Sequence, residues 1–180
     1  MKKLMVVAVM VMMSAGVQAQ DAISKFFSKY QNDDTFSQVT ISSKMFSLFT
    51  NMEVEDKDDQ EVMDAISKLK GLRILTKEDT RDSRMLYKEA MGMIPVKEYE
   101  ELMTVRDKDK DMKFFIKESG GKISELVMVM GGNEEFMVMS LFGEIDLKQV
   151  SKIGKKMNVD GLENLQNIKE KEKKTSKDND

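Results

Sequence analysis

The sequence contains no cysteine, no histidine and no tryptophan, and its only proline is Pro95. Without cysteine there is no disulfide framework, no thiol nucleophile, no thiolate metal site and no residue for lipid attachment. Without histidine the chain lacks the commonest general base and the commonest metal ligand. These absences argue against an enzyme, and we expect a non-catalytic protein that uses no cofactor.

The first residues follow the pattern of a cleavable secretory signal. A basic start is followed by an apolar run from Leu4 to Met13, and Val17-Gln18-Ala19 places small or apolar side chains where signal peptidase accepts them. The run is too short to cross a membrane, which takes about 20 residues. We therefore expect residues 1–19 to be removed and the mature chain to be periplasmic or secreted, without stable membrane insertion.

The charge of the mature chain is negative but evenly distributed. Removal of the signal takes away two lysines and no acid, so that 27 basic residues stand against 32 acidic ones and the formal net charge changes from −3 to −5. Acidic and basic residues are interleaved, and no basic stripe or polybasic patch stands out. We therefore expect no nucleic acid among the partners.

One domain accounts for most of the chain. No internal repeat and no linker divides residues 20–168, and a chain of this size can bury a core of its own. Residues 169–180 contain only Lys, Glu, Asp, Asn, Ser and Thr, a composition typical of a disordered charged tail.

The N-terminal half of the domain alternates between helical and extended patterns. Apolar residues recur at helical spacing in four segments, and two short β-type segments lie between them. The expected helices span about 23–30, 45–52, 62–69 and 85–94, and the expected strands 36–41 and 72–76. Gly71 stands where a helix C-cap is expected, and Pro95 prevents the last helix from continuing.

From Tyr99 the period becomes that of a sheet. Four strands are expected at 99–106, 112–118, 123–130 and 135–142, with hairpin turns at Gly120-Gly121 and at Gly131-Gly132-Asn133. Asp146 and Gln149 have capping-box spacing and begin a further helix. The pattern predicts an α+β fold, in which an antiparallel sheet of five or six strands, with a C-terminal four-strand meander, carries helices mainly on one face.

Methionine is unusually frequent, with 18 residues, four of which form the pairs Met128-x-Met130 and Met137-x-Met139. A turn at Gly132-Asn133 would set Met128 opposite Met137 and place all four thioethers on one sheet face. Thioether sulfur suits Cu(I), yet methionine also fills irregular gaps in cores. We favour the core interpretation and predict no metal site, with these four residues as the only candidate ligands.

A second motif has acidic residues at the spacing of a calcium-binding loop. Asp107 to Asp111 alternates aspartate with lysine, and Glu118 is at the twelfth position. The sixth position is Met112, where a calcium loop needs glycine, and the lysines neutralise the field, so a solvated hairpin loop is favoured. No spacing brings carboxylates such as Glu125 and Glu144 into a catalytic pair, which makes a carboxylate-based hydrolase the weakest hypothesis.

The stretch from Ile123 to Leu141, followed by Gly143-Glu144-Ile145-Asp146-Leu147, resembles an uncharacterised domain-of-unknown-function family. Together with the end of the signal and the segments between Phe26 and Phe49, the resemblance covers about Gln20 to Met157. It implies a small exported envelope protein of Bacteroidota-type bacteria, often lipid-anchored, with a link to envelope stress or sigma-factor regulation. This chain departs from the lipid-anchored relatives because it has no cysteine, and the family offers no catalytic residues.

We therefore expect an exported periplasmic, non-catalytic binding or interaction module whose partner is an envelope protein or a cell-envelope component. The alternative is a carrier of an apolar ligand or a soft metal on the methionine-lined sheet face. A cavity at Met128, Met130, Met137 and Met139 would favour the carrier, whereas a covered face would favour a core.

Overall fold

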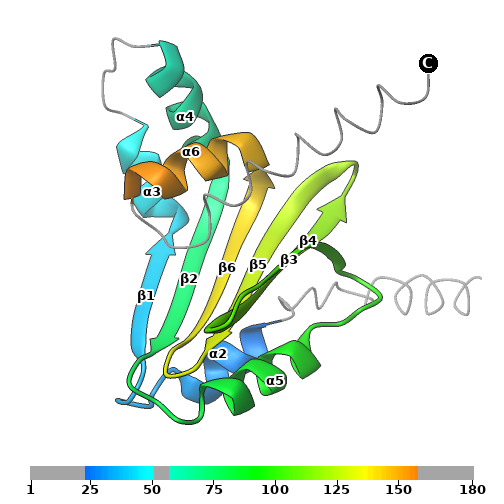
Figure 1. The fold of residues 1–180 in the computed structure, drawn as a ribbon. Coiled ribbons are helices and arrows are strands. Elements are labelled where there is room, and N and C mark those ends of the chain that lie inside the picture. The colour runs from blue at the N-terminus through cyan, green and yellow to red at the C-terminus, as the bar shows by residue number, and fades with distance from the viewer. Residues whose placement is uncertain (1–22, 51–56, 158–180) are drawn as a thin grey trace, which may run out of the picture.

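The structure, a computed structural model, describes residues 23–50 and 57–157, with the backbone alone for Phe49, 57–59 and 153–157 (Figure 1). The expected signal at 1–19, the charged tail at 169–180 and most of the acidic stretch before residue 60 lie outside this part. The described elements are, in chain order, α2 (Ser24–Tyr30), β1 (Ser37–Ser42), α3 (Ser43–Phe49), α4 (Lys57–Ser67), β2 (Leu69–Lys77), α5 (Ser83–Met93), β3 (Glu100–Arg106), β4 (Lys110–Ser119), β5 (Lys122–Gly132), β6 (Phe136–Ile145) and α6 (Leu147–Met157).

The six strands form one open sheet in the order β1-β2-β6-β5-β4-β3, and every neighbouring pair is antiparallel. β3 to β6 are the expected meander, and β2 pairs with the outer side of β6. The turn between β4 and β5 uses Gly120 and Gly121, whose φ angles of 62° and 75° need glycine. The predicted α+β fold with its antiparallel sheet is confirmed.

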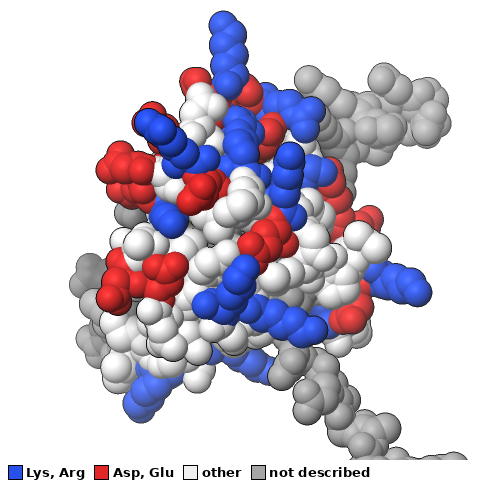
Figure 2. Space-filling model, turned by 90° about the horizontal axis from the view of Figure 1, so that it is seen from below, with Lys and Arg blue, Asp and Glu red and all other residues white. Residues whose placement is uncertain are grey.

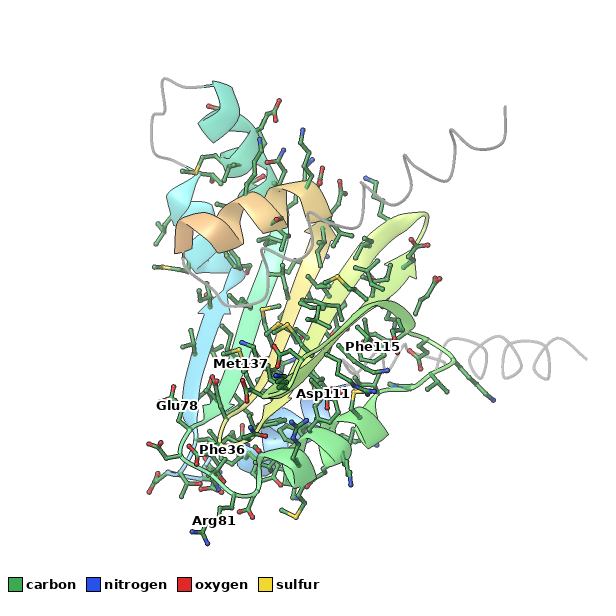
Figure 3. All side chains as sticks on the ribbon, viewed as in Figure 1. Phe36, Glu78, Arg81, Asp111, Phe115 and Met137 are labelled. Carbon is green, nitrogen blue, oxygen red and sulfur yellow. The ribbon has the colours of Figure 1, made fainter. Side chains whose placement is uncertain are left out.

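Two apolar clusters lie on the two faces of the sheet because the central strands are apolar at consecutive positions. On β5, Val127 and Val129 belong to the first cluster, whereas Leu126 and Met128 belong to the second. Side chains of neighbouring positions point to opposite faces, so a fully apolar strand must be covered twice. Figure 3 labels members of both: Phe36 and Phe115 pack in the first cluster, and Met137 packs against the second.

The sequence predicts helices mainly on one face, whereas the structure divides them between both. α2 and α5 contribute Phe26 and Leu86 to the first cluster, and α3 and α6 contribute Phe46 and Val150 to the second. α3, α4 and α6 gather at one end of the sheet, and α2 and α5 lie at the other (Figure 1). The doubly apolar β5 explains this arrangement, because helices on one face alone would leave the other face uncovered.

The sheet coils strongly, and its β3 edge crosses the other strands at a steep angle in the view of Figure 1. Leu102, Met103 and Val105 of β3 pack against the second cluster. The methionine face is thereby covered by β3 and by helices α3 and α6.

One local prediction, the helix C-cap at Gly71, is wrong. Gly71 does not end a helix but lies in β2, where a Cβ atom would approach the ring of Phe142 to 2.2 Å. The residue is glycine because an aromatic ring lies against its backbone. The helix α5 begins after Asp82, which makes no side-chain cap, while the Thr80 hydroxyl accepts a hydrogen bond from the Asp82 N–H.

The end of β6 leads into α6 as the sequence predicts. The Asp146 carboxylate accepts hydrogen bonds from the backbone N–H groups of Lys148, at 2.8 Å, and Gln149, at 3.4 Å. This is the N-cap interaction that satisfies the first amides of a helix. Among the described helices, none is long and apolar enough to cross a membrane.

Candidate functional site

Two adjoining clefts open at the end of the sheet where the β4–β5 hairpin meets the helices. One has a volume of about 600 Å³ and the other about 730 Å³. They share Lys68, Lys122, Ile123 and Glu144, which form the ridge between them. The first lies toward α4 and α6, and the second lies toward α3 and the start of β2.

The ridge is held by one carboxylate between two lysines. Glu144 lies 2.7 Å from the Lys122 ammonium and 3.8 Å from that of Lys68, and its N–H donates to the Lys68 carbonyl. The hydrogen bond from Lys122, with the charges of both lysines, lowers the pKa of Glu144. Glu144 is therefore ionised at neutral pH and compensates part of the charge of both lysines.

Gly143 makes this ridge possible. Its φ of 139° lies in a region that L side chains rarely adopt, and an added Cβ would lie 2.5 Å from the Lys68 carbonyl oxygen. The β2–β6 register shifts beside this residue, between Leu69 and Gly71. The backbones of β2 and β6 can therefore approach closely here, and the next residue, Glu144, is directed toward Lys68 and Lys122.

The two clefts have opposite charge. The carboxylates of the first outnumber its lysines; they are Glu61, Asp64, Glu118, Glu144 and Asp146. Among the described residues, the second combines four lysines and five serines with a single carboxylate, that of Glu144; its basic and hydroxyl residues are Lys44, Lys68, Lys70, Lys122, Ser43, Ser47, Ser67, Ser119 and Ser124. We call this second cleft the lysine cleft. The opposite end of the molecule shows no such segregation, because Figure 2 shows positive and negative side chains interspersed there.

The lysine cleft can bind an anionic group. Lys44 and Lys70 make no ion pair with any residue that the structure describes, so their charges are not compensated in the way those of Lys68 and Lys122 are. Several serine hydroxyls are engaged by the backbone: Ser47 donates to the Lys44 carbonyl at 2.7 Å, and Ser67 to the Asp64 carbonyl at 2.6 Å. The lysine ammonium groups are therefore the main donors, and phosphate or carboxylate oxygens are their natural acceptors.

The four candidate methionines do not line either cleft. Met128, Met130 and Met139 are at most 1 % exposed, and Met137 is partly buried against the same cluster. They share one face as expected, but Met128 lies opposite Met139 and Met130 opposite Met137. The expected pairing of Met128 with Met137 is wrong because Gly131 and Gly132 continue β5, which moves the turn to residues 133–135.

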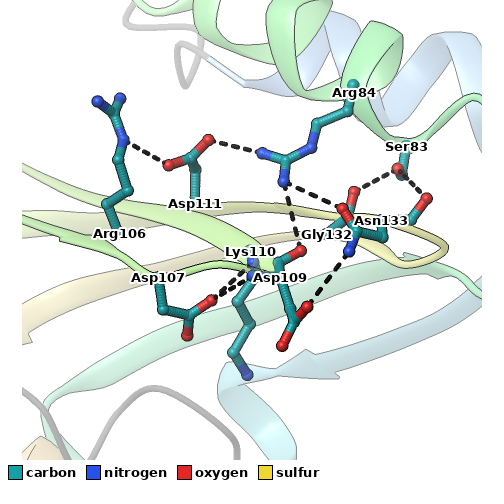
Figure 4. A network of polar contacts seen from close by, with 9 residues as sticks. All are labelled: Ser83, Arg84, Arg106, Asp107, Asp109, Lys110, Asp111, Gly132 and Asn133. Carbon is teal, nitrogen blue, oxygen red and sulfur yellow. Dashed lines mark hydrogen bonds and ion pairs between the residues drawn. The ribbon is translucent and has the colours of Figure 1, made fainter.

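The Asp107–Asp111 segment is the hairpin turn between β3 and β4 (Figure 4). The Asp107 carboxylate accepts hydrogen bonds from the N–H groups of Asp109 and Lys110, both at 2.8 Å. Asp111 accepts from Arg106 at 2.7 Å and from Arg84 of α5 at 2.6 Å. These carboxylates therefore bind the turn and α5 together, and within the described residues no group of three or more acidic side chains is placed to hold a metal ion.

α5 is also tied to the turn between β5 and β6. The Ser83 hydroxyl, fully buried, donates to the Gly132 carbonyl at 2.6 Å (Figure 4). The Gly131 backbone lies so close to α5 that a Cβ there would meet Tyr87 at 2.6 Å. This network fixes the first turn of α5 to two hairpins at the end of the sheet opposite the clefts.

Sequence reasoning missed the one buried carboxylate of the sheet. Glu125 on β5 is 5 % exposed and accepts hydrogen bonds from the Tyr99 hydroxyl and, at 2.8 Å, from the Ser140 hydroxyl. The sequence feature that could have indicated it is a glutamate in a mostly apolar strand, with a serine in the next strand. Glu125 lines neither cleft, so its interactions are structural.

The family model described as a domain of unknown function, DUF4252, matches residues 30–153. The chain belongs to the DUF4252 family. The matched region runs from the end of α2 into α6, so the whole sheet and both clefts belong to the DUF4252 domain. No curated protein and no solved structure matches the chain.

Proposed function

We propose that the mature chain is a non-catalytic binding module that recognises a phosphate- or carboxylate-bearing component of the cell envelope through the lysine cleft. The observation that supports this proposal is the convergence of four lysines on a cleft whose described lining contains one carboxylate. Clustered ammonium groups raise the local potential and attract anions even when the net charge of the protein is negative. The ligand would be small enough to fit a cleft of about 730 Å³.

The cellular setting of the proposal comes from the sequence. The basic start, the apolar run and Val17-Gln18-Ala19 support export and cleavage after Ala19, which places the module in the periplasm or outside the cell. The resemblance to exported Bacteroidota-type proteins supports an envelope role linked to stress or sigma-factor regulation. In that role, a ligand or an envelope protein bound at the cleft would be the signal that is sensed.

A carrier of an apolar ligand or soft metal on the methionine face is the less favoured function. Met128, Met130 and Met139 are packed by side chains such as Phe114 and Leu126, and this filled face is typical of a core. Among the residues that the structure describes, no methionine lines either cleft.

Binding of an anion by the purified mature chain tests the proposal. Inorganic pyrophosphate is a suitable probe because it is small and carries several charges, and isothermal titration calorimetry measures its Kd. We expect binding that weakens as salt is added, and weakens by up to about fivefold in Lys70→Ala. The matched control is Lys88→Ala, which removes the same charge from the exposed face of α5, far from the cleft.

The outcome that would contradict the proposal is clear. If pyrophosphate does not bind, or if Lys70→Ala and Lys88→Ala change the Kd equally, the cleft has no special affinity for anions. The cellular part is tested separately by intact mass spectrometry of protein recovered from the envelope fraction. A mature chain that begins at Gln20 supports export, an added mass identifies a retained partner or ligand, and an uncut chain contradicts export.

A further inference from the structure

The first of the two clefts, from here on called the acidic cleft, carries more negative charge than its own lysines compensate. Five carboxylates and two lysines, Lys68 and Lys122, are among the described residues that line it. Glu144 pairs with both lysines, and Asp146 accepts hydrogen bonds from the first amides of α6. The described lining offers no further lysine to the other three carboxylates, so this cleft attracts cations whereas the lysine cleft attracts anions.

Two of these three carboxylates are available to a ligand. Asp64 of α4 and Glu118 of β4 are exposed, and neither forms an ion pair with a residue that the structure describes. The third, Glu61, lies 3.8 Å from the Lys152 ammonium and accepts a hydrogen bond from the Gln149 amide at 3.3 Å. Uncompensated negative charge therefore remains on two walls of the acidic cleft.

A buried side chain in the wall of the acidic cleft has an acceptor without a donor. Gln149 of α6 lines the cleft and is only 7 % exposed. Its amide nitrogen donates to Glu61, whereas its oxygen Oε1 has no hydrogen-bond partner in the described part of the chain. A buried acceptor in this state costs free energy, and a ligand that donates to it removes the cost. Since ionised carboxylates are acceptors as well, the group that this cleft lacks is a positively charged N–H donor.

An ammonium group fits the acidic cleft better than a metal ion does. Within the residues that the structure describes, no three acidic side chains are placed to hold a metal ion. An ammonium group has three N–H donors, so it can donate to Gln149 and to a carboxylate at the same time. The residues of the cleft therefore indicate the chemical class of its ligand, a primary amine.

We infer that the ligand is a zwitterion, with its phosphate or carboxylate group in the lysine cleft and an ammonium group in the acidic cleft. This inference rests on the proposed function, because the lysine cleft supplies half of the site. The clefts adjoin along the ridge of Lys68, Lys122 and Glu144, whose side chains are 54 %, 63 % and 44 % exposed. A spacer between the two charged groups of the ligand can lie across these exposed side chains.

Two probes that differ in one terminal group test the inference. Aminohexyl phosphate has a six-carbon spacer between an ammonium group and a phosphate, and hydroxyhexyl phosphate has a neutral hydroxyl in place of the ammonium. We expect calorimetric titration of the mature chain to give a Kd for aminohexyl phosphate that is lower by up to about fivefold. Attraction to the lysines alone predicts the opposite order, because the ammonium reduces the net negative charge of the probe.

Substitutions in the acidic cleft should affect only the probe that bears the amine. Glu118→Gln, Asp64→Asn and Gln149→Leu should each bring the two Kd values closer together, and circular dichroism shows whether the buried Gln149→Leu variant remains folded. The matched control is Glu78→Gln, which removes a charge at the other end of β2 and should leave the ratio of the two Kd values unchanged. Lys70→Ala should weaken both probes equally, because the phosphate of each lies in the lysine cleft.

Failure of this inference and failure of the proposed function give different results. If both probes bind with the same Kd, and Lys70→Ala weakens both, the lysine cleft binds anions but the ammonium site does not exist. Tighter binding of aminohexyl phosphate that persists unchanged in Glu118→Gln, Asp64→Asn and Gln149→Leu also overturns the inference. If neither probe binds, the proposed function fails and the inference fails with it.

Discussion

The hydroxyl of Tyr99 donates a hydrogen bond to the carboxylate of Glu125, inside the face of the sheet that α2 and α5 cover. Tyr99 precedes β3 and Glu125 lies on β5, so the bond spans the width of β4, while Ser140 on β6 donates to the other carboxylate oxygen. Tyr99 is 6 % exposed and Glu125 5 %. A buried acceptor of this kind depends on its donors, because no water replaces them.

Removal of the Tyr99 hydroxyl should therefore destabilise the fold. We expect Tyr99→Phe to lower the free energy of unfolding by about 1–3 kcal/mol, since it leaves one oxygen of a buried carboxylate without its partner. The matched control is Tyr30→Phe, which removes a hydroxyl that donates to the more exposed Glu89 at 2.9 Å and should cost less. Urea denaturation measures both. If the free energy of unfolding decreases equally in the two variants, the burial of Glu125 does not make the loss of its hydrogen-bond donor more costly.

The glycines at 143 and 92 should respond to alanine in opposite directions. Gly143→Ala combines a φ of 139° with a contact of 2.5 Å to a backbone oxygen, and we expect a loss of more than about 2 kcal/mol. Gly92 lies in helix α5 with nothing within 4 Å of an added Cβ, so Gly92→Ala should stabilise the protein by about 0.5–1 kcal/mol. Thermal unfolding of both variants compares them directly. A Gly143→Ala protein as stable as the parent would mean that β2 and β6 need no close approach there.

Acid should weaken the contact between α5 and the β3–β4 turn. The hydrogen bond from Arg106, with the charge of Arg84, lowers the pKa of Asp111 below its ordinary value of 3.8. Because the folded pKa is the lower one, this carboxylate contributes stability that is present above pH 3.8 and is lost as the pH falls through the folded pKa.

Unfolding midpoints of Asp111→Asn and of the parent should therefore differ most near neutral pH and converge in strong acid. Glu78→Gln is the control, because Glu78 is exposed and makes no hydrogen bond or ion pair within the described part of the chain (Figure 3 labels both residues). A difference between parent and Asp111→Asn that does not depend on pH would contradict an electrostatic role for Asp111.

Local patterns predicted the elements well, because apolar periodicity and turn glycines are properties of neighbouring residues. The strands β3 to β6 and the Gly120-Gly121 turn follow from such patterns, as does the Asp146 cap. Gly71 was misassigned because the reason for glycine there is the Phe142 ring, which belongs to a distant strand. The predicted register of the two methionine-containing strands, β5 and β6, is wrong by two residues, because Gly131 and Gly132 are compatible with both a strand and a turn.

The lysine cleft could not be predicted in the same way. Its lysines come from α3, from β2 and the residue that precedes it, and from the β4–β5 hairpin, and each appears in the sequence as an ordinary exposed charge. The pairing of β2 with β6, which is not local, brings Lys68 to Glu144, whereas Lys122 reaches Glu144 through the pairing of β5 with β6. An even distribution of charge along the chain is therefore compatible with a segregated distribution on the surface.

The effect of Glu144→Gln on the Kd for pyrophosphate tests anion binding by the lysine cleft most directly. This substitution removes the only carboxylate among the described residues that line the lysine cleft, and it leaves Lys68 and Lys122 without their partner. We expect tighter binding in Glu144→Gln than in the parent, and weaker binding in Lys70→Ala. Binding that is absent in all three proteins, or that Glu144→Gln leaves unchanged or weakens, would contradict the proposal that this cleft recognises anions.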